Sequence, residues 1–288
     1  MLHKQRVILA LYYGLRRRLR IALRIRPRVR PPPVLSQPLE QIVQRHGSIA
    51  RYIQLYLPPD VDLTGKAVCE VGAGDCLAAA SLLLGRGAAH VDIIEVQSPV
   101  VNEKQLQVLQ RLKADGFPID IPMVRAAHGI CLDEKRVRYH RCFMEDFESE
   151  NAHELIFSFS VVEHVEDFVG FYASCWKTLC PGGWMLHVVD LSGHGCFEDP
   201  LPPLDFQTYP DWLHDLMSPP YYRATRRFFN EHVSAVTNSG FKIHQITATR
   251  KAEQGYVDRI RSKLRPAARN RPREELQVLE FVLLARKV

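Results

Sequence analysis

Hydrophobic and polar residues alternate in blocks along this 288-residue chain, and the blocks predict strands and helices in turn. Short, nearly continuous apolar runs predict strands near residues 67–71, 90–95, 138–143, 154–160, 184–190, 240–248 and 276–286. Apolar residues at helical spacing predict helices near residues 39–57, 75–85, 101–114, 166–179 and 224–238. Buried strands separated by helices require a mostly parallel sheet with both faces covered. The pattern therefore predicts a doubly wound α/β domain with a mostly parallel seven-stranded sheet.

The N-terminal segment has a different pattern, because residues 1–30 contain ten Lys and Arg residues and no acid. On a helix its apolar residues gather on one side, opposite most of the arginines: Ile8, Leu11, Tyr12, Leu15, Leu19, Ala22 and Leu23. Such a helix is typical of a segment that lies in an anionic membrane surface, here through residues 1–26. Docking on the protein's own domain or on a partner explains the pattern equally well. Prolines then form a stiff linker, so we expect a basic amphipathic helix and linker over residues 1–33 and one domain over residues 34–288.

The formal net charge of +6 comes from this segment, since the rest of the chain has 28 basic residues against 32 acidic ones. A mildly acidic domain argues against a broad nucleic-acid-binding surface. A second basic cluster is expected to be a solvated loop or helix face; its members are Arg259, Arg261, Lys263, Arg265, Arg269, Arg271 and Arg273.

The seven cysteines include no C-x-x-C pair, which is typical of a reduced, intracellular protein. The N-terminal apolar run is short and lacks a small-residue cleavage site, and no apolar stretch is long enough to cross a bilayer. We therefore expect a cytoplasmic protein, which the basic helix would hold at the inner face of the membrane if it binds lipid.

The turn after the first predicted strand is Gly72-Ala73-Gly74-Asp75-Cys76-Leu77, which fits G-x-G but lacks the third glycine of a dinucleotide-binding turn. Glu70, just before the turn, would repel a pyrophosphate and attract a cation. S-adenosylmethionine has no phosphate and carries a sulfonium and an ammonium group, so it suits this turn better than NAD does. Glu95, at the end of the second strand, is placed to accept hydrogen bonds from ribose hydroxyls.

The stretches EVGAGD, IIEV, FMEDF, LIFSFSVVEHV and LCPGGWMLHVVD resemble, in order and spacing, the class I S-adenosylmethionine-dependent methyltransferases, over roughly residues 60–288. The resemblance implies a Rossmann-like methyltransferase fold and S-adenosylmethionine as cofactor. It implies that Glu70, Gly72 and Gly74 face the methionine part, and that Glu95 faces the ribose. Met144 and Glu145 would face the adenine edge. Many relatives have an aspartate where Phe143 stands, so the adenine contact is expected to rest on backbone groups and an apolar wall.

A finer resemblance lies in HVVDLSGH, DWLHDLM and YYRATRRFFNEHVSAVTNSGF, which look like a branch associated with bacterial surface-polysaccharide or sugar modification. It implies O-methylation of a sugar, glycolipid or other small hydroxylated acceptor. Two alternatives remain open: a nucleic-acid methyltransferase, and a non-catalytic cofactor-binding module that is recruited to a membrane or partner.

Methyl transfer to a hydroxyl requires an acceptor held in line and a group that removes its proton. His164 directly follows the fourth strand and Asp190 ends the fifth, as in similar sugar and small-molecule O-methyltransferases. We predict that His164 is the base and Asp190 orients it, with His194 in reserve, whereas mid-strand His187 is expected to be a core residue. Ser160 is predicted to contact the cofactor, and because it stands where metal-using relatives have an acid, no metal is expected.

Overall fold

The structure is a computed structural model, and it describes residues 37–127, 129–193, 202–217 and 224–288. The expected N-terminal helix and His194 lie outside the described residues.

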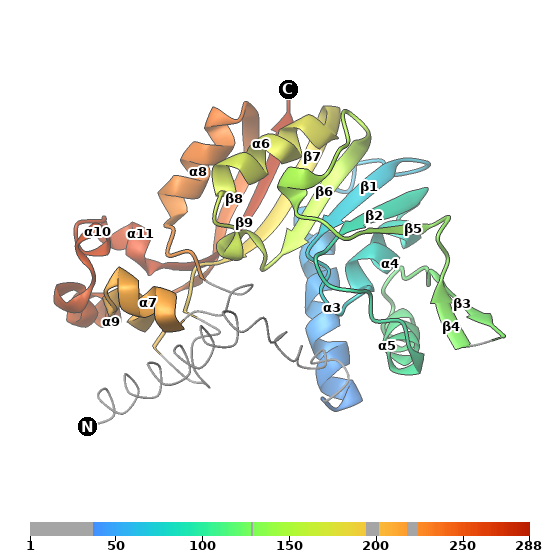
Figure 1. Ribbon diagram of the computed structural model, residues 1–288, viewed down its shortest axis with the longest axis horizontal. Coiled ribbons are helices and arrows are strands. Elements are labelled where there is room, and N and C mark those ends of the chain that lie inside the picture. Colours follow the sequence, from blue (N-terminus) through green and yellow to red (C-terminus); the bar gives the residue numbers. More distant parts are fainter. Residues whose placement is uncertain (1–36, 128, 194–201, 218–223) are drawn as a thin grey trace, which may run out of the picture.

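One seven-stranded sheet forms the centre of the molecule (Figure 1). Its strands are β1 (Ala67–Val71), β2 (His90–Ile94), β5 (Val137–His140), β6 (His153–Phe159), β7 (Leu179–Asp190), β8 (Phe241–Lys251) and β9 (Val278–Lys287). The order across the sheet is β5-β2-β1-β6-β7-β9-β8, and only β9 is antiparallel to its neighbours. The strand order reverses beside β1, and such a switch point opens a ligand crevice at the carboxyl ends of the strands. The expected fold class is confirmed.

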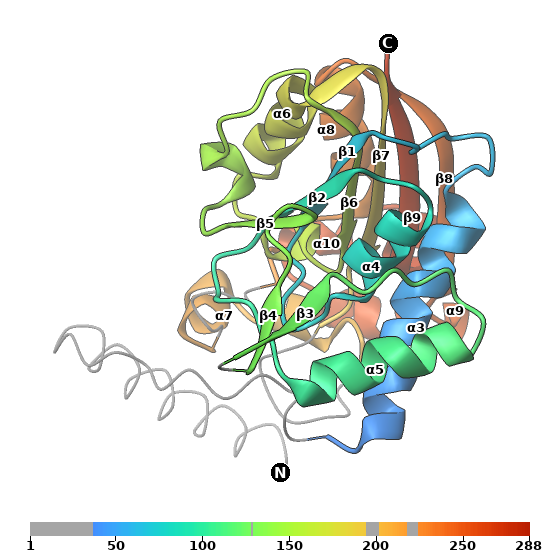
Figure 2. The same cartoon turned by 90° about the vertical axis from the view of Figure 1, so that its right-hand side faces the viewer.

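Helices cover both faces of the sheet, as Figure 2 shows from the side. On one face lie α3 (Leu39–Tyr56), α4 (Ala78–Gly85) and α5 (Glu103–Ala114), whose apolar residues form one core cluster with β1 and β2. On the other face, α6 (Phe168–Thr178) and α8 (Phe229–Asn238) enclose a second cluster that includes Phe171, Tyr172 and Phe281. Two helices begin at side-chain caps: Asn102 accepts a hydrogen bond from Gln105 N–H, and Asp167 accepts one from Gly170 N–H.

Three local features differ from the sequence prediction. A hairpin of β3 (Met123–Ala126) and β4 (Gly129–Leu132) forms a separate two-stranded sheet, and its mostly exposed residues gave no buried-strand signal. The helix expected from residue 75 begins at Ala78, because the Cys76 thiol accepts the Ala78 N–H and Leu77 is the N-cap. β7 begins at Leu179, five residues earlier than predicted.

The segment between β8 and β9, residues 252–277, forms a small helical lobe, which we call the C-terminal lobe. It consists of α9 (Gln254–Ile260), η4 (Arg261–Lys263), α10 (Pro266–Arg269) and α11 (Arg273–Gln277), and it encloses its own apolar cluster with Leu204 and Phe228. The Arg265 N–H of this lobe donates a hydrogen bond of 2.9 Å to the Gln207 carbonyl, in the segment before α7 (Asp211–Met217). Its basic residues are not simply a solvated face, which corrects the prediction, since Arg261, Arg265 and Arg271 bond to groups inside the protein. Among the helices described here, none is long and apolar enough to cross a membrane.

Candidate functional site

The two glycines after β1 are required for different reasons. Both have a positive φ, +71° at Gly72 and +59° at Gly74, which glycine adopts without strain. A Cβ on Gly72 would lie 2.3 Å from the Val161 Cγ2 atom, so this glycine also lets the turn pack against the residues after β6. A Cβ on Gly74 would meet no atom within 4 Å. The turn is therefore packed at its first glycine and open at its second.

Glu70 places a carboxyl group beneath this turn. It is 5% exposed, and its Oε2 atom has no hydrogen-bond partner among the described residues. Burial raises the pKa of Glu70 to about 8, against a lowering by the backbone N–H of Ala80, and the nearby charge of Glu95 raises it further. An unsatisfied buried carboxyl of this kind is stabilised by a cation that lies against it.

Glu95, which follows β2, joins two loops at the same edge. One carboxylate oxygen accepts the Gly74 N–H at 2.8 Å, and the other accepts the Gln97 N–H at 3.0 Å. The Tyr139 hydroxyl donates a long hydrogen bond, 3.5 Å, to the Gly74 carbonyl. Gln105 completes the support of the turn, because its amide reaches the Asp75 carbonyl and the Leu77 N–H. Sequence reasoning missed Tyr139 and Gln105, whose residue types carry no motif.

The residues expected at the adenine edge follow β5. Met144, in η1 (Met144–Asp146), is buried and packs in the second core cluster. Glu145 is exposed. Phe143 is 55% exposed, which is unusual for a large apolar side chain and fits the expected apolar wall.

The turn after β6 brings Ser160 and His164 to the same edge. Ser160 has φ +54°, which is uncommon for a residue with a side chain, and its N–H bonds to the Val188 carbonyl of β7. His164, half-buried, ends the single turn η2 (Val162–His164). Between them lies Glu163, which is 3% exposed and whose carboxyl oxygens have no partner among the described residues. Burial raises the pKa of Glu163 far above its usual range, and the charge of Asp190 adds to the rise.

Asp190 ends β7, and its carboxylate is held by two residues. Its Oδ1 atom accepts the Ser192 N–H at 2.8 Å, the Ser192 hydroxyl at 2.6 Å and the Arg250 guanidinium at 2.6 Å. Within the described part of the chain its hydrogen bonds go to these groups rather than to His164, so the expected pairing of Asp190 with His164 stays a prediction. Arg250 was not foreseen, because it lies 60 residues further along the chain.

A polar group of three residues completes this edge beyond Asp190. The Glu280 carboxylate accepts hydrogen bonds from the Tyr52 and Thr249 hydroxyls, each at 2.6 Å. Burial raises the pKa of Tyr52 to about 12, and the hydrogen bond to Glu280 contributes to the rise. Tyr52 also packs edge-on against Phe159, with the ring centres 5.3 Å apart. This part of the edge thus combines aromatic rings with carboxylates.

The remaining histidine prediction concerns His187, which is fully buried in β7, as expected for a core residue. Its Nδ1 atom lies 2.6 Å from the Ser158 hydroxyl, and burial lowers its pKa to about 3.

Taken together, the structure brings six of the predicted site residues to one edge of the sheet: Glu70, Gly74, Glu95, Ser160, His164 and Asp190.

Comparison with known proteins gives no match to any protein-family model and no match among curated protein sequences. A search of solved structures does find proteins whose backbone can be superposed on this chain. A Listeria monocytogenes protein described as a candidate S-adenosylmethionine-dependent methyltransferase is 15% identical, with 85% of this chain and 99% of that chain covered and a TM-score of 0.49. A Mesorhizobium loti S-adenosylmethionine-dependent methyltransferase is 14% identical, with 86% and 100% covered and a TM-score of 0.45. Because both scores are below 0.5, the fold assignment rests on the strand order of the chain itself.

Proposed function

We propose that this protein binds S-adenosylmethionine at the turn of Gly72 to Gly74 and methylates a hydroxyl group of a sugar, glycolipid or other small acceptor. The observation that carries the proposal is Glu70, a buried carboxyl at the switch point of the sheet, one of whose oxygens has no partner in the described part of the chain. The cofactor carries an ammonium and a sulfonium cation. A cation beside the Glu70 carboxyl would favour its ionised form and so stabilise the complex.

The same residues fit a dinucleotide poorly. A pyrophosphate at the turn would approach the Glu70 carboxyl, and its negative charge would raise the cost of ionising that group further. The third glycine of a dinucleotide turn is Leu77 here, and its side chain is buried in the core. An adenosine cofactor without phosphate fits this turn, and Glu95 can exchange its loop hydrogen bonds for those of ribose hydroxyls.

The chemistry of the bound cofactor is an activated methyl group, which needs a positioned acceptor more than it needs further activation. The protein's own task is then to hold the acceptor hydroxyl and to accept its proton. His164 is the proposed base, because it lies at the carboxyl end of β6 and is half-exposed. Arg250 holds the Asp190 carboxylate in place beside the end of β7.

Calorimetry on the full chain tests the cofactor assignment. We expect micromolar binding of S-adenosylmethionine and of its demethylated product, and no binding of NAD. Glu70→Gln should weaken cofactor affinity about tenfold or more, because a charge-assisted contact is lost. Glu134→Gln, which removes an exposed carboxylate on another part of the surface, is the matched control. Tight NAD binding without any response to S-adenosylmethionine would overturn the proposal.

The base is tested by His164→Ala. Turnover should fall by about 10² or more while cofactor affinity stays nearly unchanged, which is the usual scale for losing a general base. The wild-type rate should rise with pH across the range in which histidines titrate, since only neutral imidazole accepts a proton. His244→Ala, an exposed histidine on β8, is the control. Full turnover of His164→Ala with an unchanged pH profile would remove His164 from the mechanism.

The competing functions are separated by one labelling experiment. Incubation of the protein with cell fractions and methyl-labelled S-adenosylmethionine should place label in lipid or glycan. Label in RNA or DNA would favour a nucleic-acid methyltransferase, and no transferred label from a cofactor-binding protein would favour a non-catalytic module.

We also propose that residues 1–26 attach the protein to anionic membranes, on the basis of their amphipathic arginine-rich sequence. Each cation near an anionic surface contributes about 1 kcal/mol. Deletion of residues 1–33 should leave cofactor binding intact and abolish sedimentation with anionic vesicles. Full-length protein that ignores such vesicles at low salt would contradict this.

A further inference from the structure

The segment before α8 lies directly against the proposed catalytic turn. The Thr225 N–H donates a hydrogen bond of 2.8 Å to the carbonyl of Glu163, the residue before His164. The two residues that follow Thr225 are Arg226 and Arg227. Arg226 has φ +60°, a strained conformation for a residue with a side chain, and such strain is concentrated at functional sites. The contact places two consecutive arginines beside η2.

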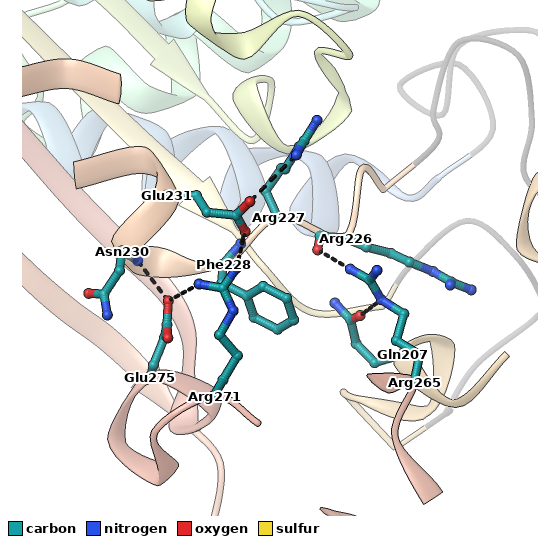
Figure 3. A network of polar contacts seen from close by, with 9 residues as sticks. All are labelled: Gln207, Arg226, Arg227, Phe228, Asn230, Glu231, Arg265, Arg271 and Glu275. Atoms are coloured by element: carbon teal, nitrogen blue, oxygen red, sulfur yellow. Dashed lines mark hydrogen bonds and ion pairs between the residues drawn. The ribbon is translucent and has the colours of Figure 1, made fainter. Parts of the chain in front are cut away.

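Arg227 makes a longer carboxylate contact than the nearby Arg226 and Arg271 do. Its guanidinium carbon lies 4.9 Å from the centre of the Phe168 ring, at the start of α6. Its Nε atom is buried without a hydrogen-bond partner among the described residues, and its NH1 atom is 3.5 Å from a Glu231 oxygen, the limit of a hydrogen bond. The side chain is 41% exposed. Figure 3 shows Arg227 pointing away from Arg226, Arg265 and Arg271.

The neighbouring carboxylates are already engaged by other groups. Arg271 reaches both Glu275, at 3.2 Å, and Glu231, at 3.3 Å (Figure 3). Glu231 also accepts the Phe228 N–H. Arg265 donates to the Gln207 side chain and to the Arg226 carbonyl, neither of which is charged. Among the described residues, Arg226, Arg227 and Arg271 thus share three carboxylates, those of Asp211, Glu231 and Glu275, while Arg265 contacts none. Arg227 is the most exposed of the three paired arginines, at 41% against 29% for Arg271 and 4% for Arg226.

We infer that Arg227 binds a phosphate group of the acceptor, so that the substrate is a hydroxylated molecule with a phosphate or diphosphate ester. This inference rests on the proposed function, because it identifies the substrate of the same site. The guanidinium carbon of Arg227 packs over the Phe168 ring, and a planar guanidinium matches two phosphate oxygens at once. A doubly charged phosphate is attracted more strongly than a singly charged carboxylate by a partly exposed cation. The Thr225–Glu163 hydrogen bond holds the segment of Arg227 against η2, which ends at His164, so one molecule could present its hydroxyl to the base and its phosphate to Arg227.

The test measures binding of inorganic pyrophosphate to the full chain saturated with demethylated cofactor, by calorimetry at low salt. Wild type should bind pyrophosphate in the millimolar range or tighter, and more tightly than it binds malonate, a dicarboxylate. Arg227→Gln should weaken pyrophosphate binding about tenfold or more, the scale of a lost charge-assisted hydrogen bond. Arg227→Lys should fall between the two, because it keeps the charge but loses the planar fork. Arg259→Gln, an exposed arginine of α9, should bind as wild type does.

The outcomes separate this inference from the proposed function. If the cofactor binds but pyrophosphate does not, or binds no better than malonate, the phosphate assignment is wrong and the methyltransferase proposal stands. If Arg227→Gln binds pyrophosphate as wild type does, Arg227 is only a structural contact of Phe168. If pyrophosphate binds and S-adenosylmethionine does not, the proposed function fails instead. Cofactor affinity of each variant shows that it is folded, and Arg227→Lys replaces Arg227→Gln if the latter is not.

Discussion

The glycine turn and the arginine network are held together in opposite ways. Two hydrogen bonds of the turn join residues that lie close in the sequence: Gly72 N–H to the Ile94 carbonyl, and Gly74 N–H to the Glu95 carboxylate. The network joins side chains from residues 207 to 275 across several elements (Figure 3). Contacts that are local in sequence leave a readable motif, whereas long-range side-chain contacts leave none. The sequence therefore shows a motif for the turn proposed to bind the cofactor, but no motif for the network proposed to bind the acceptor.

Each region also contains a buried polar atom that has no partner among the described residues. In the turn it is Oε2 of Glu70, and in the network it is Nε of Arg227. If each of these groups binds a ligand, changing it should alter ligand binding. Changes to the contacts that hold each region should alter folding instead.

The largest expected effect comes from the tight packing of the turn. Gly72→Ala places a methyl group 2.3 Å from Val161 and forces alanine to a positive φ. Overpacking and strain together should cost about 3 kcal/mol of unfolding free energy. Gly74→Ala meets no neighbour and should cost only about 1 kcal/mol, while it narrows the open side of the turn. Urea unfolding measures both, and equal losses would show that packing against Val161 does not matter.

A smaller effect is expected in the network. Arg271→Met removes the partner of Glu275, which is buried, and of Glu231, so the unfolding free energy should fall by about 2 kcal/mol. Adding Glu275→Gln should recover part of this loss, because the stranded carboxylate becomes neutral. Urea unfolding of the single and double variants measures the coupling. A double variant that is less stable than Arg271→Met alone would contradict the assignment of this pair.

The smallest expected effect is the change in unfolding free energy that Glu70 contributes for each unit of pH. Burial raises its pKa in the folded state from the ordinary 4.5 to about 8. The folded state then binds the proton more tightly than the unfolded state does, so the penalty is absent below 4.5, grows as pH rises, and is complete above about 8. Without cofactor, wild type should lose up to about 1 kcal/mol per pH unit relative to Glu70→Gln in this window. Parallel curves for the two proteins would show that Glu70 is not buried as described.

The sheet and the turn formed by Glu70, Gly72 and Gly74 could be predicted from the sequence, because each depends on a short-range sequence pattern. Apolar runs identified β1, β2 and β6 closely, and the position of Glu70 before two glycines indicated the cofactor. The Asp190–Arg250 pair could not be predicted, since 60 residues separate its members and neither residue type is unusual. The basic cluster of the C-terminal lobe was misread for the same reason: arginine is usually exposed, and only the folded structure brings Arg265 to Gln207.

The position of β9 has a consequence for the order in which the sheet assembles. β9 lies between β7 and β8, although it follows both in the chain, and among the described strands β8 pairs only with β9. During synthesis, β7 and β8 emerge from the ribosome before the strand that joins them. Their unpaired edges then offer hydrogen-bonding groups to other nascent chains, which is a known route to aggregation. A variant that weakens β9 should therefore reduce soluble yield in cells before it changes the properties of the molecules that fold.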